Sequence, residues 1–215
     1  HPLTEGLDRF LSRSLSGQAL RDRLDVCSRW LAKNFVKEDS RVVDLGGGSG
    51  SYAFEALRIK RNIPSGFVWD VVDLDAEAVD LVLTKASEMS LGQIIQARQK
   101  NFMKENKEVP PADYAVLIGV LCGMDTAAAT RCLERVKLHL KEEGEILAAT
   151  LLKTAFREDP RTFRVLCNVG GWQLRPKEVE DVRHVFEAAG WDVIDLFGER
   201  PGGGGQYAIV HAKGK

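Results

Sequence analysis

The glycine-rich segment 46–50 is the part of the sequence whose residue types and spacing best suit ligand chemistry. It follows the hydrophobic run 42–45, in which Asp44 is the one charged residue, and it precedes a helix expected at 52–61. Glycine lets the backbone turn sharply and approach a ligand that a Cβ atom would block. A turn of this kind at the carboxyl edge of a parallel sheet predicts a ligand site.

Asp44 and the glycine spacing restrict the class of ligand. A dinucleotide fingerprint needs a glycine where this sequence has Ser51, and a phosphate loop needs a Gly-Lys-Ser/Thr ending that is absent. A carboxylate buried at a strand end is costly without a partner, and it would repel a pyrophosphate. Asp44 therefore favours a cationic or amino-bearing ligand.

No side chain stands out as a catalytic base or as part of a metal site. The histidines are expected to be structural or surface residues. They are His1, His139, His184 and His211. The cysteines are too scattered for a metal site or a disulfide framework, so we expect reduced thiols in a cytoplasmic protein. They are Cys27, Cys122, Cys132 and Cys167. Tyr52, Cys122 and Asp125 fall near the expected site and are interpreted as packing or capping residues.

Alternating strands and helices must position the glycine turn. Hydrophobic runs predict strands at 41–45, 67–73, 91–98, 114–118 and 146–152. Helical stretches are expected between them at 52–61, 76–89 and 126–141. This alternation is typical of right-handed βαβ units and predicts a mostly parallel sheet.

The two ends of the chain are expected to depart from this alternation. Residues 3–36 are predicted to be helical, with Ser16 as an N-cap, and to form either an edge helix or a lid over the site. A helix is expected at 176–189. The strands at 191–197 and 206–211 follow without an intervening helix, so we interpret the glycine-rich connection between them as the turn of an antiparallel hairpin.

The composition is that of a single globular domain. The 215 residues can bury one sizeable core, and apolar residues make up 44% and charged residues 28% of the chain. The 30 Lys and Arg residues against 31 Asp and Glu residues give a net charge of −1, which argues against a strongly basic nucleic-acid-binding domain. No apolar run approaches the ~20 residues of a membrane span, and no secretory signal is recognisable.

The segment Asp44-Leu45-Gly46-Gly47-Gly48-Ser49-Gly50 resembles motif I of the class I S-adenosylmethionine-dependent methyltransferases. Further landmarks of that family follow in the expected order over about residues 38–212. They are Val72-Asp73-Leu74-Asp75 after the second strand, Asn101-Phe102 after the third, Gly119-Val120-Leu121 after the fourth, Gly144-Glu145-Ile146-Leu147 at the fifth and Ala189-Gly190-Trp191 before the terminal hairpin.

The resemblance implies a Rossmann-like α/β fold with a seven-stranded sheet in the order 3-2-1-4-5-7-6, the last strand being antiparallel. The implied cofactor is S-adenosyl-L-methionine, with S-adenosyl-L-homocysteine as its product. Asp73 would accept hydrogen bonds from the ribose hydroxyls. Asn101 would contact the adenine amino group, and Phe102 would stack against the adenine ring. The implied cofactor-binding residues are Asp44, Gly46, Gly47, Gly48, Gly50, Asp73, Leu74, Asn101, Phe102, Gly119 and Val120.

The rest of the chain is expected to select the acceptor. We predict an N-terminal helical cap at 1–37, a methyltransferase domain at 38–215 and a substrate-facing insertion at about 153–175. Five basic and two acidic residues give the insertion a charge of +3. It forms either a solvated helix face or a surface that receives an anionic acceptor. The candidate acceptor-binding residues are Arg157, Arg161, Arg164 and Trp172.

The predicted activity is methyl transfer from S-adenosylmethionine to a small acceptor, with an anionic acceptor as one alternative. Alignment of the acceptor and exclusion of water would do most of the catalysis, and no catalytic residue is assigned. Ile118-Gly119-Val120-Leu121 replaces the Asn/Asp-Pro-Pro-aromatic motif of amino-nucleobase methyltransferases, which disfavours DNA amines. Protein or RNA methylation, a non-catalytic cofactor-binding module and, less favoured, an NAD-dependent oxidoreductase stay open.

Overall fold

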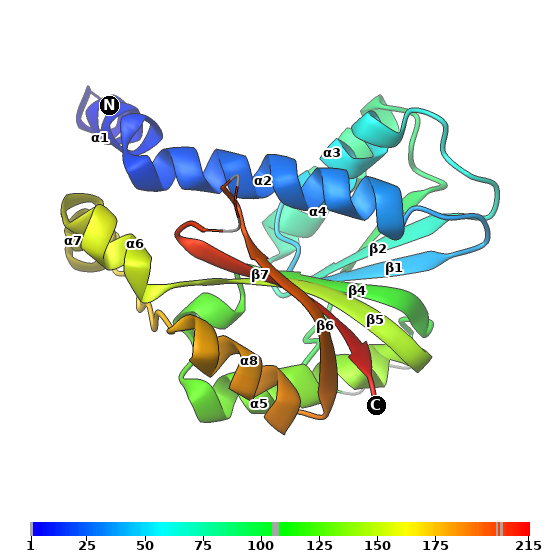
Figure 1. Ribbon diagram of the computed structural model, residues 1–215. Coiled ribbons are helices and arrows are strands. Elements are labelled where there is room, and N and C mark those ends of the chain that lie inside the picture. The colour runs from blue at the N-terminus through cyan, green and yellow to red at the C-terminus, as the bar shows by residue number, and fades with distance from the viewer. Residues whose placement is uncertain (1, 105–107, 201, 203) are drawn as a thin grey trace.

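Seven strands form one central sheet in a computed structural model that describes residues 2–104, 108–200, 202 and 204–215 (Figure 1). The order is β3-β2-β1-β4-β5-β7-β6, and β7 is antiparallel to both of its neighbours. The predicted strand order and antiparallel strand are confirmed. The strands are β1 Arg41–Leu45, β2 Val68–Asp73, β3 Ile95–Gln99, β4 Ala112–Ile118, β5 Leu140–Leu151, β6 Trp191–Gly198 and β7 Tyr207–Gly214. His1 lies outside the described residues, and so do Pro201 and Gly203 of the predicted hairpin turn.

Helices cover both faces of the sheet (Figure 1). α2, α3 and α4 pack on one face through side chains such as Leu31, Phe54 and Val82, and α5 and α8 pack on the other through Leu133 and Phe186. The helices are α1 Pro2–Arg13, α2 Leu15–Asn34, α3 Ser51–Lys60, α4 Ala76–Glu88, α5 Thr126–Val136, α6 Lys153–Glu158, α7 Pro160–Asn168 and α8 Val179–Ala188, with short 3-10 helices at Leu121–Gly123 and Lys137–His139. Within the described residues, no helix is long and apolar enough to cross a membrane.

Helix caps fix the points at which the chain leaves the sheet. Asp75 accepts a hydrogen bond from the amide of Glu77 and caps α4, and Asp125 accepts one from the amide of Ala128 and caps α5. Both aspartates satisfy amides that the first helical turn leaves free. For Asp125, which the sequence left between a packing and a capping role, the structure shows the capping role.

β5 is longer than predicted. It begins at Leu140 instead of 146, because Leu140 pairs with Ala112 at the start of β4. The helix expected at 126–141 is shortened accordingly and ends in a 3-10 turn. The third strand begins at Ile95, since the preceding residues form turns.

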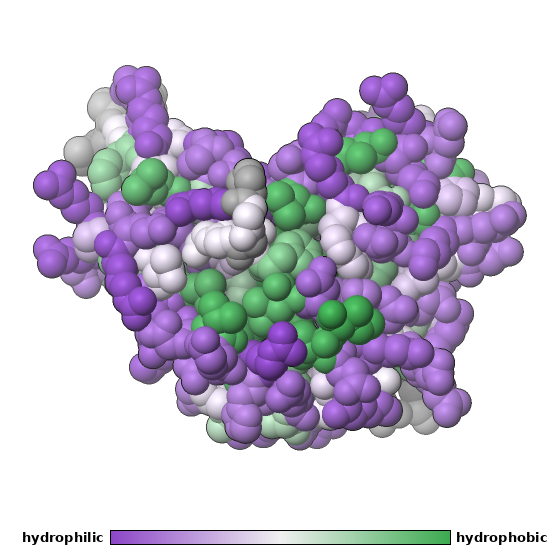
Figure 2. Space-filling view, viewed as in Figure 1, coloured by the Kyte–Doolittle hydropathy of each residue, from purple (hydrophilic) through white to green (hydrophobic). Residues whose placement is uncertain are grey.

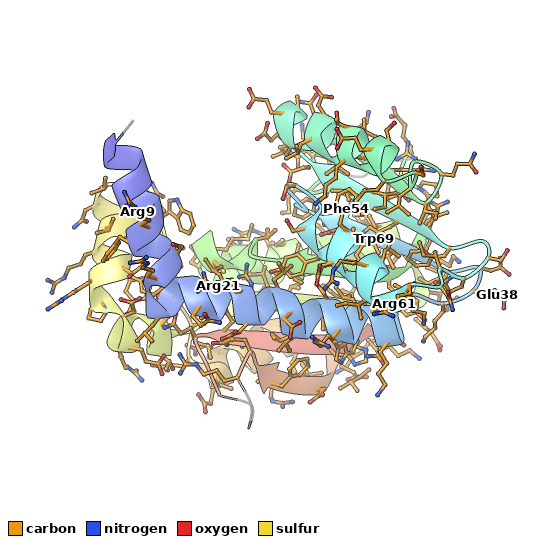
Figure 3. The ribbon with its side chains drawn as sticks, turned by 90° about the horizontal axis from the view of Figure 1, so that it is seen from above. Arg9, Arg21, Glu38, Phe54, Arg61 and Trp69 are labelled. Carbon is orange, nitrogen blue, oxygen red and sulfur yellow. The ribbon has the colours of Figure 1, made fainter. Side chains whose placement is uncertain are left out.

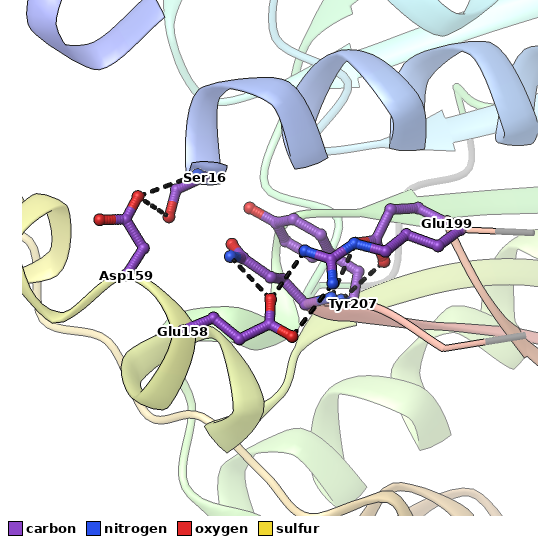
Figure 4. A network of polar contacts seen from close by, with 7 residues as sticks. Ser16, Glu158, Asp159, Glu199 and Tyr207 are labelled. Atoms are coloured by element: carbon purple, nitrogen blue, oxygen red, sulfur yellow. Dashed lines mark hydrogen bonds and ion pairs between the residues drawn. The ribbon is translucent and has the colours of Figure 1, made fainter. Parts of the chain in front are cut away.

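Ser16 does not cap a helix, which corrects the prediction. Ser14 is the N-cap of α2, and its side chain accepts a hydrogen bond from the amide of Gly17. Ser16 instead donates from its amide and its hydroxyl to Oδ2 of Asp159, at 3.0 Å each (Figure 4). Asp159 is also the N-cap of α7, so this contact joins α2 to the predicted insertion.

Extended backbone also replaces the expected start of the last helix. α8 begins at Val179 and not at 176, because Lys177 pairs with the end of β5. The Lys177 amide donates to the carbonyl of Leu151, and the Lys177 carbonyl accepts from the amide of Lys153. The segment that follows the insertion is thereby fixed to the sheet.

Candidate functional site

The glycine turn between β1 and α3 adopts a backbone that favours glycine. Gly46 and Gly48 have φ angles of 69° and 53°, in the left-handed region. A Cβ atom on Gly46 would lie 2.7 Å from Cγ2 of Val120, and one on Gly47 would lie 2.8 Å from Cγ of Asp44. Four of the predicted cofactor-binding residues therefore meet here, and alanine does not fit at either contact.

The N-terminus of α3 opens directly from this turn. Gly50 is its N-cap residue, with a φ angle of 67° and no side chain to bond the first amides. Free amides and the helix dipole make such an N-terminus favourable for negatively charged or oxygen-bearing ligand atoms. The turn thus presents backbone donors to a ligand at the sheet edge.

Asp73 connects the end of β2 to the same turn. Its Oδ2 accepts a hydrogen bond of 2.8 Å from the amide of Gly48, and its Oδ1 accepts one of 3.0 Å from the amide of Asp75. The neighbouring Leu74 is 62% exposed. A carboxylate has lone pairs beyond the two used here, so Asp73 can also accept hydrogen bonds from a vicinal diol.

Asp44 is buried beneath the turn, and its Oδ2 has no hydrogen-bond partner among the described residues. Burial, together with the nearby charge of Asp73, raises the pKa of Asp44 to about 7. The indole N–H of Trp69 lies close enough to oppose this rise but does not reach hydrogen-bonding geometry. A positive charge bound above the turn would favour the ionised form of Asp44.

Asn101 and Phe102 follow β3, and the structure places them differently from one another. Asn101 is partly buried, and its Oδ1 accepts a hydrogen bond of 2.9 Å from the amide of Met103. Phe102 is only 8% exposed, and its ring lies 3.8 Å from the Cβ position of Gly46. Phe102 therefore supports the turn from the core, while a second lone pair on Asn101 stays able to accept.

A cavity of about 220 Å³ lies beside the end of β4, between α2 and α7. We refer to it as the α2–α7 cavity. Gly119, which follows β4 with a φ angle of 88°, lies at its edge. The lining residues are Ser16, Leu20, Arg23, Gly119, Cys122, Gly123, Leu151, Phe163, Leu166, Trp172, Leu174 and Tyr207. The cavity is therefore mostly apolar and is built from both segments that the sequence left for acceptor selection.

The outline of the molecule dips above α2 (Figure 1 and Figure 2). Figure 2 shows a notch in the outline of the molecule between α1 on one side and the α3 and α4 helices on the other. From above, Arg9 and Arg21 come from the N-terminal helices, whereas Phe54 and Trp69 lie on the α3 side (Figure 3). The turn follows β1 and Gly119 follows the neighbouring parallel strand β4, so both lie at the carboxyl edge of the sheet, where Gly119 also lines the α2–α7 cavity.

Arg23 is the residue of this site that sequence reasoning missed. Its Nε donates a hydrogen bond of 2.9 Å to the hydroxyl of Tyr52, and its guanidinium lies 4.3 Å from the ring centre of Tyr207. Its Nη2 is 4.0 Å from the Cβ position of Gly119. The available signal was an arginine on the face of α2 that also carries Cys27 and Leu31, both of which are buried.

The four candidate acceptor-binding residues are not brought together. Trp172 lines the α2–α7 cavity and is 52% exposed. Arg157 forms an ion pair of 2.8 Å with Glu178 and lines a separate, open cavity. Arg161 and Arg164 are exposed on α7, outside the set of residues that line the α2–α7 cavity.

The three histidines that the structure describes lie in structural contacts or at the surface. His139 is buried, with Nε2 at 2.7 Å from the carbonyl oxygen of Phe102. His211 hydrogen-bonds Glu145 at 2.8 Å, and His184 is exposed on α8. The described residues contain no cluster of His, Cys, Asp or Glu that could hold a metal ion.

The edge described above fits S-adenosylmethionine. The turn leaves space above Gly48, where a Cβ atom would meet nothing within 4 Å. Asp73 offers a carboxylate for the ribose, and the unpartnered, buried oxygen of Asp44 faces the underside of the turn that would carry a cationic ligand. These are features that a nucleoside with a positively charged substituent requires.

The chain belongs to the class I S-adenosylmethionine-dependent methyltransferases. The family model of a methyltransferase domain matches residues 18–196, more than half of the chain. This match confirms the family that the motifs resembled, methyl transfer as its chemistry and S-adenosylmethionine as its cofactor. No curated protein matches the chain significantly.

Solved structures share this fold at low sequence identity. A possible exported protein from Bordetella parapertussis has a TM-score of 0.76 at 21% identity, over 95% of this chain and 71% of that one. The magnesium protoporphyrin IX methyltransferase from Synechocystis PCC 6803, solved with bound S-adenosylhomocysteine, has a TM-score of 0.71 at 14% identity, over 96% and 87%. Mitomycin 7-O-methyltransferase has 0.68 at 17%, over 90% of this chain and 54% of its own. This chain therefore spans about half of the last protein.

Proposed function

We propose that this protein transfers a methyl group from S-adenosylmethionine to a small acceptor held in the α2–α7 cavity. The observation that carries the proposal is the position of Gly119. It lines the cavity and is followed directly by Val120, which contacts the cofactor turn at Gly46. A cofactor on the turn and an acceptor in the cavity would meet at this point. Two methyltransferases of the same fold are named after small molecules, mitomycin and magnesium protoporphyrin IX. These names support a small acceptor.

The residues of the chain act mainly by binding and orienting. When bound, the cofactor supplies a methyl group on a positively charged sulfur, which reacts with a nucleophile without further activation. Asp73 holds the ribose, the turn supports the cofactor from below, and the absence of a side chain at Gly119 leaves the space between cofactor and acceptor open. α2 and Trp172 cover the cavity and exclude water, which strengthens the alignment of the reacting atoms.

No general base is assigned to the reaction. Among the described residues that line the α2–α7 cavity, none is a histidine, an aspartate or a glutamate. Burial raises the pKa of Tyr52 and of Tyr207 to about 12, so both hydroxyls are protonated near pH 7. We infer that the acceptor presents a nucleophilic atom that is already free of its proton, or that loses the proton to water.

Three further predictions are also proposed here for the chain. We retain the division into a helical cap at 1–37 and a methyltransferase domain at 38–215, with the insertion at 153–175 facing the acceptor. We also propose a cytoplasmic location, because all four cysteines are free thiols and disulfides are rare in that compartment. Arg161 and Arg164, which are exposed on α7, would form an outer basic surface for an acceptor, whereas Arg157 is paired with Glu178.

Calorimetry with S-adenosylhomocysteine tests the cofactor part of the proposal. Binding in the micromolar range is expected, and failure to bind would contradict it. A panel of small acids, phenols and amines, incubated with cofactor carrying a labelled methyl group, tests the acceptor part. Label should appear in at least one small molecule; binding without transfer to any acceptor would favour a non-catalytic binding module.

A further inference from the structure

Arg23 places a positive charge in the lining of a mostly apolar cavity. The side chain leaves the middle of α2 and is partly buried between Tyr52 and Tyr207. Among the described residues, only Nε has a hydrogen-bond partner, which is the hydroxyl of Tyr52. The two Nη groups are thus available as parallel donors, and Nη2 faces Gly119.

The charge of Arg23 is not neutralised within the described part of the chain. No carboxylate lies within 4.0 Å of its guanidinium, whereas Arg200 of the same region forms two hydrogen bonds to Glu158, at 3.0 and 2.7 Å (Figure 4). The adjacent tyrosines do not supply a negative charge, because burial keeps their hydroxyls protonated near neutral pH. A partly buried cation without a counterion is costly, and an anionic ligand would remove that cost.

The rest of the cavity defines the other half of the ligand. Its walls carry Leu20, Phe163, Leu166, Trp172 and Leu174, which bind apolar or aromatic surface. Arg23 is the one charged side chain among the described residues of this lining. A single guanidinium with two free donors matches one carboxylate through paired hydrogen bonds. The cavity is therefore complementary to a small molecule with an apolar body and one carboxylate.

We propose that the acceptor is a small apolar or aromatic carboxylic acid, bound through its carboxylate by Arg23 at the Gly119 side of the α2–α7 cavity. This inference rests on the proposed function, since it names the class of molecule that the same site takes. A carboxylate oxygen of this acid would attack the methyl carbon as the bond from that carbon to the sulfonium sulfur breaks, which would give a methyl ester and S-adenosylhomocysteine. This step needs no general base, because a carboxylate is deprotonated near pH 7.

The cofactor is a second source of a carboxylate, through its methionine part. The lining favours the acceptor as the source, because Arg23 shares its cavity with Phe163 and Trp172 of the insertion. Asp73 and Gly48, which the proposed function assigns to the cofactor, are not among the lining residues. The experiment below separates the two sources.

Matched ligand pairs test the proposal on protein saturated with S-adenosylhomocysteine. The probes are benzoate and benzamide, 3-phenylpropanoate and 3-phenylpropanamide, and indole-3-acetate and indole-3-acetamide, with affinities from titration by ligand-observed NMR. At least one carboxylate should bind about tenfold or more tightly than its amide. Arg23→Gln should abolish that preference, and Arg21→Gln, an exposed arginine on the same helix, should retain it. If no carboxylate is preferred in the wild-type protein, the proposal is overturned.

A cofactor control identifies the other source. If Arg23→Gln weakens S-adenosylhomocysteine tenfold, leaves 5′-methylthioadenosine unchanged and keeps the preference for aromatic carboxylates, Arg23 binds the cofactor carboxylate and the proposal is wrong. Binding of S-adenosylhomocysteine to the wild-type protein is measured before any acid is added. If the wild-type protein does not bind it at all, the proposed function is wrong.

A crystal of the wild-type protein with S-adenosylhomocysteine and 4-bromobenzoate gives a test that does not depend on the folding of a variant. The bromine, located by its anomalous scattering, should lie against Phe163 or Trp172, with the carboxylate in hydrogen-bonding distance of Arg23. A carboxylate bound elsewhere, or no bound acid, would overturn the proposal.

Discussion

The amide and the hydroxyl of Ser16 both donate to the same oxygen of Asp159, at 3.0 Å each, across 143 positions of the sequence. Ser16 lies in the first turn of α2 and Asp159 caps α7, so one carboxylate fixes the two walls of the α2–α7 cavity to each other. The amide of Thr162 also donates to Asp159. The shape of the cavity therefore depends on this contact.

Asp159→Ala should loosen the insertion. The variant loses the cap of α7 and leaves the amide of Ser16 without a partner, so we expect the free energy of unfolding to fall by about 2–4 kcal/mol. Hydrogen exchange of α7 amides should accelerate at least tenfold, while the affinity for S-adenosylhomocysteine changes less than twofold. Ser12→Ala, an exposed serine of α1, is the control. Unchanged exchange in α7 would show that the contact does not hold the insertion.

Asp73→Asn should weaken S-adenosylhomocysteine by about 10- to 100-fold, because hydrogen bonds to a charged carboxylate contribute about 1.5–3 kcal/mol. Calorimetry measures this, with Asp80→Asn, an exposed aspartate of α4, as the control. Because Asp73 also accepts from the amides of Gly48 and Asp75, the same titrations are repeated with the 2′-deoxy analogue. Wild-type protein should discriminate against the analogue and Asp73→Asn should not. Equal discrimination by both proteins would refute the ribose assignment.

Asp44 should make the protein less stable as the pH rises. Its pKa is raised by burial, and then by Asp73, from an ordinary value of 3.8 to about 7. The folded state therefore binds more protons than the unfolded state between about pH 4 and pH 7, and the free energy of unfolding falls across that window. The difference is at most about 4 kcal/mol for this shift. Above about pH 7 Asp44 is ionised in the folded protein, and the full cost of burying its charge lowers the free energy of unfolding.

Urea unfolding of wild-type protein and of Asp44→Asn at pH 5 and pH 8 measures this effect. Asp44→Asn should remove most of the dependence and gain stability relative to wild type at pH 8. A cationic cofactor should favour the ionised carboxylate, so wild-type affinity for S-adenosylmethionine should rise between pH 6 and pH 8 and that of Asp44→Asn should not. Parallel stability curves for the two proteins would contradict the assignment.

The strand order and the glycine turn could be predicted because their signals are local. The run before Gly46 and the run that ends at Asp73 are mostly hydrophobic, as buried parallel strands are, and the φ angle of Gly46 favours glycine. The start of β5 could not be predicted, because Lys141, Glu142 and Glu143 are exposed strand residues that resemble a helix end. Leu140 pairs with Ala112 and Glu145 with Tyr114 across a register shift, and Glu143 has a φ angle of 62°. This irregular start of β5 therefore depends on β4, which is distant in sequence.

The acceptor side could not be predicted because its contacts are between residues far apart in sequence. Arg23, Gly119 and Tyr207 come from α2, the end of β4 and the start of β7, and no spacing pattern relates them. The clustered arginines of the insertion dominated the charge pattern, yet Arg157 is satisfied by Glu178. A single arginine within a helix is a weaker signal of a binding site than a cluster of basic residues. In this protein, however, the single arginine, Arg23, lines the cavity.

Alanine substitutions at Gly46 and at Gly48 should affect stability and cofactor binding to different degrees. A Cβ atom on Gly46 would lie 2.7 Å from Val120, whereas one on Gly48 would meet open space. Gly46→Ala should therefore cost both the clash and the left-handed backbone, about 2–4 kcal/mol in unfolding free energy. Gly48→Ala should cost only the backbone term, about 1–2 kcal/mol.

Binding should rank these two variants differently. The open space above Gly48 is where the cofactor would lie, so Gly48→Ala should weaken S-adenosylhomocysteine at least tenfold in spite of its smaller loss of stability. Adding Val120→Ala to Gly46→Ala should restore part of the stability, since it removes the atom that clashes but not the strained φ angle. Thermal unfolding and calorimetry measure both quantities. If Gly48→Ala binds as wild type does, the cofactor does not lie over this turn.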